Sequence, residues 1–276
     1  GPAPRSIARP GRGAARAETM NVRRVLVTRP AEEPPTLDDL LRELGAEPVR
    51  LPCIAFAPPT DRTPLDALLA RLREGARPDF VAIASAHAAD RFVLELRDAG
   101  LDPAAALAGT SILAAGASTA RKLRSLGLSA RAPPEAVGAE AMVAAFGGEV
   151  RGKEVLVPRA EEGNPALVDG FAREGARLSA VPLYRTVPVT AADPAAAALL
   201  RAGRIDAIAF ASGSAARGFA ALFGTEAPSL AAASRVACMG ETCAEAARAA
   251  GLPVDAVAAG GFRDLARAIE SLLTGR

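Results

Sequence analysis

The sequence predicts an α/β protein made of two similar domains, each with a parallel sheet that carries helices on both faces. Two observations support this prediction. An internal repeat runs through most of the chain, and each copy alternates short apolar runs with longer segments of helical periodicity. Successive βα units form parallel sheets, because right-handed crossovers return the chain to the same sheet with a helix against one face.

The repeat consists of three blocks that recur in the same order. The matching pairs are residues 25–33 with 155–162, 79–92 with 206–219, and 112–120 with 236–244. Small deletions shift the spacing only slightly from one block to the next. Chance does not preserve the order of three blocks over so long a span, so we interpret the chain as an internal duplication.

The first copy shows the expected alternation in chain order. Short apolar runs predict strands at residues 24–28, 48–56, 80–84 and 111–115. Leucine or alanine at helical spacing predicts helices at residues 37–44, 65–72, 88–96, 118–126 and 139–146. Gly45 follows the first of these helices and is expected to end it. The pattern is typical of doubly wound, flavodoxin-like folds.

Composition limits the possible function classes. Of the 276 residues, 50% are apolar and 23% are charged, and the net charge of +2 is too small to indicate nucleic-acid binding. No apolar run approaches the roughly 20 residues that a membrane helix needs, so we expect no membrane partner. Three cysteines and one histidine argue against a metal site or a disulfide framework. Free thiols are typical of a reducing compartment, and we expect a cytoplasmic protein.

Residues 1–20 differ from the rest of the chain. Four arginines lie among alanine, proline and glycine, and no apolar segment of the kind found in secretory signals follows them. We expect a disordered leader, with Met20 as the effective start of the folded protein; an organellar transit peptide is the alternative. The sequence has no long heptad pattern or large apolar stripe, so we expect a monomer.

The loops that follow the predicted strands carry the candidate binding residues. In parallel sheets these loops lie at one edge, where ligands bind. The six loops contain Thr28 and Arg29, residues 85–87, residues 116–119, Pro158 and Arg159, residues 212–214, and residues 240–243. The first-turn amides of one helix stabilise an anion by about 0.3–1 kcal/mol. Six helix N-termini around a cleft would therefore form a polyanion site without a large net charge.

Each of these residues also has a structural interpretation. Serine, threonine and glycine at helix starts are common caps. His87 is either an exposed first-turn residue or a contact to a substrate carboxylate. Tyr184, the only tyrosine, fits an amphipathic packing role at a domain junction. Arg29 and Arg159 occupy equivalent loops, and as a pair they are candidates for carboxylate recognition.

The sequence gives little support to covalent or nucleotide chemistry. The chain has one histidine and no GxSxG elbow. The loops at Gly116 and Gly240 lack the further glycines of a dinucleotide fingerprint and the lysine of a phosphate-binding loop. An enzyme with these residues would act by positioning its substrate and placing charge, and we expect no cofactor.

Eight short motifs follow one another along the folded part of the chain. They lie at residues 25–30, 51–54, 84–89, 116–120, 155–160, 181–186, 210–215 and 240–244. Each motif is permissive by itself, but their order, spacing and duplication together are specific. From Val25 to Leu273 the chain resembles the uroporphyrinogen-III synthase family.

The resemblance implies two flavodoxin-like domains joined by a two-stranded β linker, with linker strands near residues 51–58 and 181–188. The first domain would comprise residues 21–51 and 184–276, and the second domain residues 52–183. The resemblance also implies a cofactor-free cyclising lyase that converts hydroxymethylbilane to uroporphyrinogen III, with loss of water and inversion of ring D. Transient contact with the upstream bilane-forming enzyme is expected.

Transferred motif by motif, the resemblance implies roles for individual residues. Tyr184 would assist departure of the bilane hydroxyl or orient the substrate. The implied substrate-binding residues are Arg29, Ser85, His87, Gly116, Ser118, Thr119, Arg159, Ser212, Ser214, Gly240, Thr242 and Cys243. Ala84, Cys243 and Asn164 depart from the residues usual in the family. These departures leave open a non-catalytic relative that binds tetrapyrroles or polycarboxylates, and a two-lobed solute-binding protein is a third interpretation.

Overall fold

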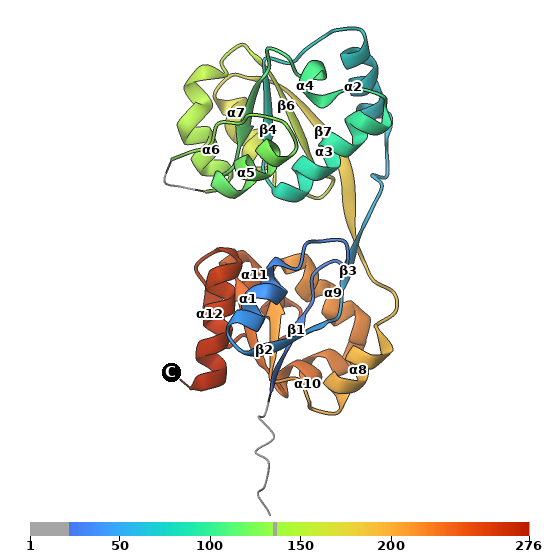
Figure 1. The fold of residues 1–276 in the computed structure, drawn as a ribbon, viewed down its shortest axis with the longest axis vertical. Helices are drawn as coiled ribbons and strands as arrows, with labels where there is room; N and C mark the ends of the chain where they lie inside the picture. Colours follow the sequence, from blue (N-terminus) through green and yellow to red (C-terminus); the bar gives the residue numbers. More distant parts are fainter. Residues whose placement is uncertain (1–21, 135–136, 276) are drawn as a thin grey trace, which may run out of the picture.

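The computed structural model describes residues 22–134 and 137–275. Figure 1 shows two lobes, one above the other, that are joined by two extended segments on one side. We call the part built on strands β1, β2, β8, β9 and β10 the first lobe, and the part built on β4, β5, β6 and most of β7 the second lobe. The leader expected at residues 1–20 lies outside the described residues.

The first lobe contains a five-stranded parallel sheet in the order β10-β9-β8-β1-β2. Its strands are β1 (Arg23–Val27), β2 (Ala46–Arg50), β8 (Ala207–Phe210), β9 (Arg235–Met239) and β10 (Ala256–Ala258). Numbered within the lobe, the order is 2-1-3-4-5, which is that of a flavodoxin-like doubly wound sheet. The first two strands come from the start of the chain and the other three from its end.

Helices cover both faces of this sheet. They are α1 (Thr36–Glu43), α8 (Pro194–Arg201), α9 (Gly213–Phe223), α10 (Ala227–Ala232), α11 (Glu241–Ala249) and α12 (Gly261–Thr274), with a 3₁₀ turn at Gly224–Glu226. Leu26 of β1 packs into the core beneath α8, α9 and α11, whereas Val25 and Val27 pack on the opposite face against α1 and α12. Because both faces are covered, the strand reads as an unbroken apolar run.

The second lobe contains a mixed sheet in the order β3-β7-β6-β4-β5. Its strands are β3 (Ile54–Ala57), β4 (Phe80–Ile83), β5 (Ser111–Ala114), β6 (Glu154–Ala160) and β7 (Arg177–Pro188). The surrounding helices are α2 (Thr63–Arg73), α3 (Ala86–Asp98), α4 (Pro103–Ala106), α5 (Ala117–Ser125), α6 (Ala139–Phe146) and α7 (Ala166–Arg173), with a 3₁₀ turn at Gly147–Glu149. The parallel arrangement expected from the sequence applies to the pairs among β4, β5, β6 and β7, but β3 pairs with β7 in the antiparallel direction.

The expected extended segment at residues 48–56 is two strands in two different sheets. Beyond β2, the amide of Leu51 donates to Val27 and the amide of Cys53 donates to Thr28, so the chain follows β1 to the end of its sheet. It then leaves the first lobe as β3. The sequence pattern also missed α4, a single helical turn that Asp102 caps by accepting from the amide of Ala105. An aspartate followed by proline was the available signal.

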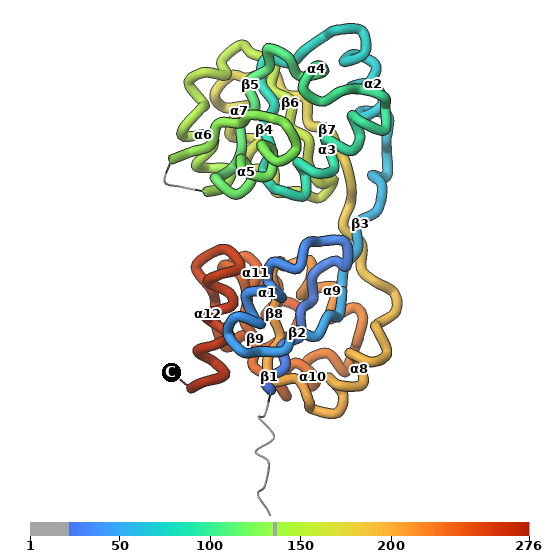
Figure 2. Tube along the Cα trace, viewed as in Figure 1, coloured from blue at the N-terminus to red at the C-terminus, as the bar shows by residue number. Residues whose placement is uncertain are grey.

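Strand β7 belongs first to the second-lobe sheet and then to the connection between the lobes, where it pairs with β3. From Arg177 to Tyr184 it runs parallel to β6, and from Arg185 to Pro188 it runs antiparallel to β3 (Figure 2). A bulge between Arg159 and Ala160 interrupts the first ladder where the second begins.

The loop after β6 forms hydrogen bonds to both connecting segments. The carboxylate of Glu161 accepts from the amide of Thr60 at 2.6 Å, and that of Glu162 accepts from the amide of Thr186 at 3.2 Å. The hydrogen bond from Thr60 lowers the pKa of Glu161. Within the part of the chain that the structure describes, no helix is both long and apolar enough to cross a membrane.

Substitution of Gly218 by alanine should destabilise the protein, because α9 lies directly against the chain where it leaves the first lobe. A Cβ atom at Gly218 would overlap the carbonyl oxygen of Cys53 and approach Ile54. We expect Gly218→Ala to lower the free energy of unfolding by about 1–3 kcal/mol, although alanine is normally favoured over glycine inside a helix.

Urea unfolding measures this difference. Gly148→Ala is the matched control, since a Cβ atom there meets no atom within 4 Å. An equal or higher unfolding midpoint for Gly218→Ala would contradict the close packing of α9 on Cys53.

Candidate functional site

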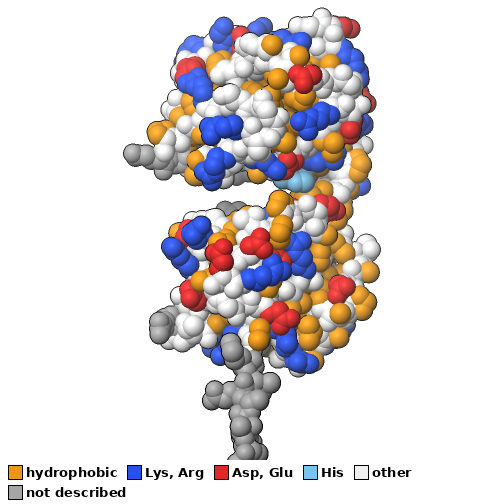
Figure 3. All heavy atoms as spheres, in the orientation of Figure 1, with side chains coloured by type: hydrophobic (Ala, Val, Ile, Leu, Met, Phe, Trp, Pro, Cys, Tyr) orange, Lys and Arg blue, Asp and Glu red, His pale blue; other side chains and the backbone are white. Residues whose placement is uncertain are grey.

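A pocket lies where the two lobes approach each other beside the connecting strands. Figure 3 shows the molecule notched between the lobes. The pocket has a volume of about 260 Å³. The first lobe contributes loop and helix-start residues that include Arg29, Glu33, Ser212, Ser214 and Phe262, and the other wall is formed by Phe56, Ser85, His87, Tyr184 and Thr186. Five of the residues singled out in the sequence, together with Tyr184, therefore line one pocket.

The serines of this pocket sit at helix N-termini. Ser85 precedes α3 and accepts from the amide of Ala88 at 3.1 Å, while Ser212 precedes α9 and accepts from the amide of Ala215 at 3.2 Å. The hydroxyl groups of Ser212 and Ser214 lie 3.0 Å apart. Two opposed lobes thus each direct a capped helix N-terminus toward the pocket, with the positive end of its dipole nearest the ligand space.

Three rings form a cluster on the second-lobe side of the pocket. The imidazole of His87 stacks on Phe56 with ring centroids 3.7 Å apart and an interplanar angle of 24°. The imidazole and Tyr184 meet edge to face with ring centroids 4.5 Å apart and an interplanar angle of 88°, and Phe56 and Tyr184 also meet edge to face at 5.2 Å. Because the rings come from β3, α3 and β7, the cluster forms only when the chain is folded.

His87 is an uncharged residue at neutral pH. Burial, together with the nearby positive charge of Arg91, lowers its pKa to about 4, while Asp90 and Glu32 oppose the shift. The start of α3 also disfavours a cation there. The carboxylate contact considered from the sequence would therefore need a neutral imidazole as hydrogen-bond donor, rather than an ion pair.

Tyr184 is buried, with 8% of its surface exposed. Burial raises the pKa of its phenol, the Ser85 hydroxyl opposes the rise, and the carboxylates of Glu33 and Glu162 add to it. The phenol therefore keeps its proton at neutral pH and can donate a hydrogen bond into the pocket. The residue stands in β7 opposite the bulge at Ala160, so its backbone position is held by the sheet.

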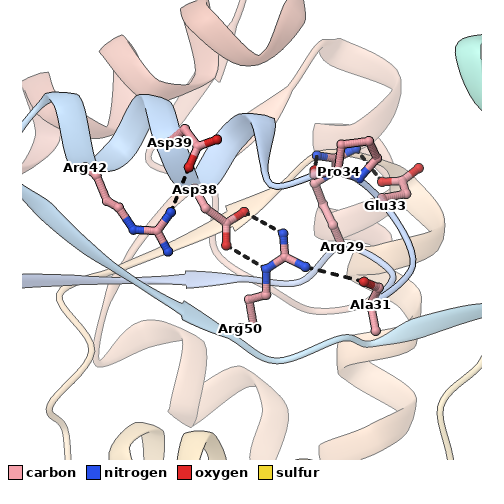
Figure 4. A network of polar contacts seen from close by, with 8 residues as sticks. All are labelled: Arg29, Ala31, Glu33, Pro34, Asp38, Asp39, Arg42 and Arg50. Atoms are coloured by element: carbon pink, nitrogen blue, oxygen red, sulfur yellow. Dashed lines mark hydrogen bonds and ion pairs between the residues drawn. The ribbon is translucent and has the colours of Figure 1, made fainter.

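Arg29 is held firmly on the first-lobe wall. Its guanidinium forms an ion pair with Glu33 at 2.5 Å and lies 4.0 Å above the ring centroid of Phe262. Figure 4 shows this pair beside a second one, in which Arg50 contacts both oxygens of the buried Asp38 at 2.6 and 3.1 Å. Hydrogen bonding to Asp38 raises the pKa of Arg50. The charge of Arg29 is compensated by Glu33 before any ligand binds.

Arg159 lines a neighbouring pocket of about 270 Å³ within the second lobe. Ala84, Ser85, Asn164 and Tyr184 line the same pocket. The guanidinium donates to the carbonyl of Ala160 at 3.2 Å and lies over Gly163. Ser85 and Tyr184 line both pockets, so the two pockets are adjacent. Arg29 lines one of them and Arg159 lines the other.

The remaining candidates lie at the starts of α5 and α11, which follow β5 and β9. Thr119 is 5% exposed and Cys243 is 4% exposed, and the Cys243 thiol donates to the carbonyl of Phe210 inside the first-lobe core. Ser118 and Thr242 are exposed. Gly116 and Gly240 begin α5 and α11 without a side-chain cap. Any contact from Thr119 or Cys243 to a ligand would therefore come from the backbone.

Three residues of the pocket had no signal in the sequence strong enough to select them. Phe56 looked like an ordinary strand residue, and Glu33 belonged to a repeat block without a distinct role. Phe262 begins the last helix after two glycines. Their place in the site depends on contacts between segments that are far apart in the chain.

The fold and pocket define a class of protein: two doubly wound α/β lobes with a pocket between their facing edges that residues of both lobes line. Comparison with protein families narrows this class. The sequence model of the family described as "Uroporphyrinogen-III synthase HemD" matches residues 35–260. The chain belongs to the uroporphyrinogen-III synthase family.

Two relatives agree with this assignment. The chain is 30% identical over 199 residues to "Porphyrin biosynthesis protein HemD" of Ruminiclostridium josui, a match that covers 72% of this chain and 39% of that protein. It is 30% identical over 201 residues to "Uroporphyrinogen-III synthase" of Synechococcus elongatus, covering 72% of this chain and 74% of that protein. The chain thus spans well under half of the first relative and about three quarters of the second.

Solved structures show the same fold. A mutant uroporphyrinogen III synthase from Thermus thermophilus superposes with a TM-score of 0.57 at 19% identity, and the alignment covers 92% of this chain and all of that one. Uroporphyrinogen-III synthetase from Helicobacter pylori superposes with a TM-score of 0.59 at 15% identity and the same coverage. At such identities the likeness concerns the fold alone.

Lowering the pH from 6.5 to 4 should destabilise the natural protein more than the His87→Phe protein. The unfolded chain protonates His87 near pH 6.5, whereas the folded protein does so near pH 4. Between these values the unfolded state binds more protons, so the free energy of unfolding falls as the pH falls. Urea unfolding of both proteins at pH 7 and pH 4.5 measures the effect. The same pH dependence in both proteins would contradict a lowered pKa of His87.

Proposed function

We propose that the chain is a uroporphyrinogen-III synthase that closes hydroxymethylbilane into uroporphyrinogen III, with inversion of ring D and loss of one water. The observation that carries this proposal is the pocket that joins both lobes, in a chain of this family, with the protonated Tyr184 on its wall. Such a pocket suits a reaction in which a flexible substrate must be bent into one shape.

We further propose that the lobes are two domains produced by duplication, at residues 21–51 with 184–276 and at residues 52–183. Strand order supports the duplication, while the packing of Ile54 in the first-lobe core and of Tyr184 in the second-lobe core supports a crossing of the chain between the lobes close to these boundaries. In the second lobe, β6, β7, β4 and β5 occupy the places that β1, β2, β8 and β9 occupy in the first. A parallel bridge from Leu113 to Arg131 stands where β10 stands in the first lobe. On this view, β3 and the end of β7 are a two-stranded linker.

The substrate that this function implies carries eight carboxylates on four pyrrole rings. The proposed anion-binding groups are the first-turn amides after the strands, the hydroxyl groups of Ser85, Ser212 and Ser214, and the guanidinium groups of Arg29 and Arg159. Each helix N-terminus contributes only about 0.3–1 kcal/mol, up to about 2 when partly buried. Several acting on one polyanion would bind it while the protein stays close to neutral in net charge.

In the proposed mechanism, Tyr184 donates a hydrogen bond or its proton to the hydroxyl that leaves as water when its carbon–oxygen bond breaks. The resulting azafulvenium carbon is attacked by the substituted α-carbon of ring D, which forms a spiro intermediate. The older bond from that carbon to the bridge then breaks, and the freed bridge carbon bonds to the other α-carbon of ring D. Loss of a proton from that carbon restores the pyrrole. This proton balances the one that was used to form water.

In this mechanism the main contribution of the protein is control of the geometry of the bound bilane. Positioning can lower a barrier by about 7–11 kcal/mol in well-oriented systems, and fixed donors stabilise the charge that moves between rings. None of these steps calls for a cofactor, so we propose a cofactor-independent lyase. A cytoplasmic location, a monomeric state and transient contact with the bilane-forming enzyme remain predictions from the sequence.

A non-catalytic tetrapyrrole-binding relative is less well supported. Two of the residues that suggested it, Cys243 and Ala84, lie where the change from the usual family residue is tolerated. Cys243 lies in the first-lobe core, where a thiol in place of a hydroxyl does not face the pocket. Ala84 is exposed beside Arg159 and leaves space in the second-lobe pocket without removing a buried partner.

Incubation with enzymatically generated hydroxymethylbilane tests the proposed function. We expect the type III isomer to dominate, because the bound bilane is held in the shape that inverts ring D. Chromatographic separation of the oxidised type I and type III porphyrins measures the product. Type I alone, at the rate seen without protein, would contradict the proposal.

Tyr184→Phe should slow turnover while leaving some type III product. Removal of the phenol takes away one donor near the leaving hydroxyl, but the positioning by both lobes remains. We expect a loss well below the roughly 10²–10⁴-fold that a general acid contributes. Near-ultraviolet circular dichroism and urea unfolding check that the variant is folded. Complete loss of activity in a folded variant would instead make Tyr184 an obligatory acid.

A further inference from the structure

His87 carries a nitrogen that the protein itself does not satisfy. Nε2 is buried and has no hydrogen-bond partner among the described residues. Buried polar atoms in proteins are nearly always paired, so an unpaired one in a pocket wall needs an explanation. The plane of the imidazole is also fixed, because the ring stacks on Phe56 and meets Tyr184 edge to face. His87 lines the pocket, so this nitrogen belongs to a side chain that a bound ligand would contact.

The surroundings decide which ligand group suits Nε2. Phe56 and Tyr184 form an aromatic wall next to it, whereas the polar loops with Arg29, Ser212 and Ser214 lie across the pocket. The charged groups near the imidazole are Asp90 and Arg91 on its own helix, with Glu32 from the first lobe. The proposed substrate offers carboxylates, which accept hydrogen bonds, and pyrrole N–H groups, which donate them. A neutral imidazole with its proton on Nδ1 presents Nε2 as an acceptor.

We propose that Nε2 of His87 accepts a hydrogen bond from a pyrrole N–H of the tetrapyrrole, so that His87 is a positioning residue for one ring. This inference rests on the proposed function. The aromatic wall would contact the face or edge of the ring, and the amide-rich loops would hold the carboxylates. A hydrogen bond to the ring nitrogen opposes rotation of the pyrrole about its bridging carbons. The rotation of a ring decides which α-carbon meets the reactive centre, and hence which isomer forms.

The chain contains a single histidine, which makes the test direct. Protein labelled with ¹⁵N in histidine, with any purification tag removed, gives nitrogen resonances from His87 alone. The probe is uroporphyrinogen III, kept reduced under anaerobic conditions, with saturation followed by quenching of Tyr184 fluorescence. At pH 7 we expect Nε2 to stay unprotonated and its resonance to move in the direction of hydrogen-bond acceptance on binding.

Each other result has a definite meaning. Protonation of both ring nitrogens on binding would make His87 a carboxylate contact, and protonated Nε2 in a neutral ring would make it a donor; both overturn the inference. Saturation of the protein without any change at the imidazole also overturns it, while the proposed function stands. Failure of uroporphyrinogen III to bind at all would remove the inference and weaken the proposed function, which the product assay tests separately.

Two variants provide a functional readout. His87→Gln places an amide group near the position of Nε2, whereas His87→Phe keeps an aromatic ring for stacking and removes the acceptor. We expect kcat/KM to fall about tenfold in His87→Phe, with a larger share of type I product, and to recover to within about threefold in His87→Gln. Equal isomer ratios in the natural protein and a folded His87→Phe protein would overturn the positioning role.

Discussion

The pairing of β7 with two partners is the constraint on which the arrangement of the lobes depends. The strand follows β6 in the second lobe as far as Tyr184 and then runs antiparallel to β3. Ile54 of β3 packs in the first-lobe core, while Tyr184 packs in the second-lobe core, so the short ladder is anchored at both ends. The same residues that connect the lobes therefore also form the wall of the pocket between them.

Charge at the pocket is divided between compensated side chains and helix amides. Arg29 is paired with Glu33 before any ligand arrives. In the first turns of α3 and α9, the Ser85 and Ser212 hydroxyls accept from one amide each. The amides before it in each helix have no carbonyl partner within the helix, as at any helix N-terminus. Such an arrangement favours binding of carboxylates by many weak donors, and it suits a ligand whose charge is spread over a large surface.

Much of the fold could be predicted from the residues, because local patterns determine it. The repeat blocks, the apolar runs at residues 80–84 and 111–115, and the leucines of α2 all correspond to observed elements. Ser85 and Ser212 could be selected because a serine between a buried strand and a helix is a cap wherever it occurs. The residues alone did not predict the antiparallel pairing of β3, since residues 48–56 read as one extended run and the partner strand lies far away in the chain; only the family resemblance implied a two-stranded linker there.

What the sequence determined by itself was the alternation of strands and helices, the duplicated motifs and therefore the loops at the edges of two sheets. Periodicity, turn residues and caps are properties of neighbouring residues, and they survive without knowledge of the tertiary structure. The structure alone decided that Phe56, His87 and Tyr184 share one cluster, that Cys243 turns into the core, and that Glu33 compensates Arg29. These features are contacts between segments that lie far apart in the chain. They form because tertiary packing brings those segments together, and no local sequence pattern relates them.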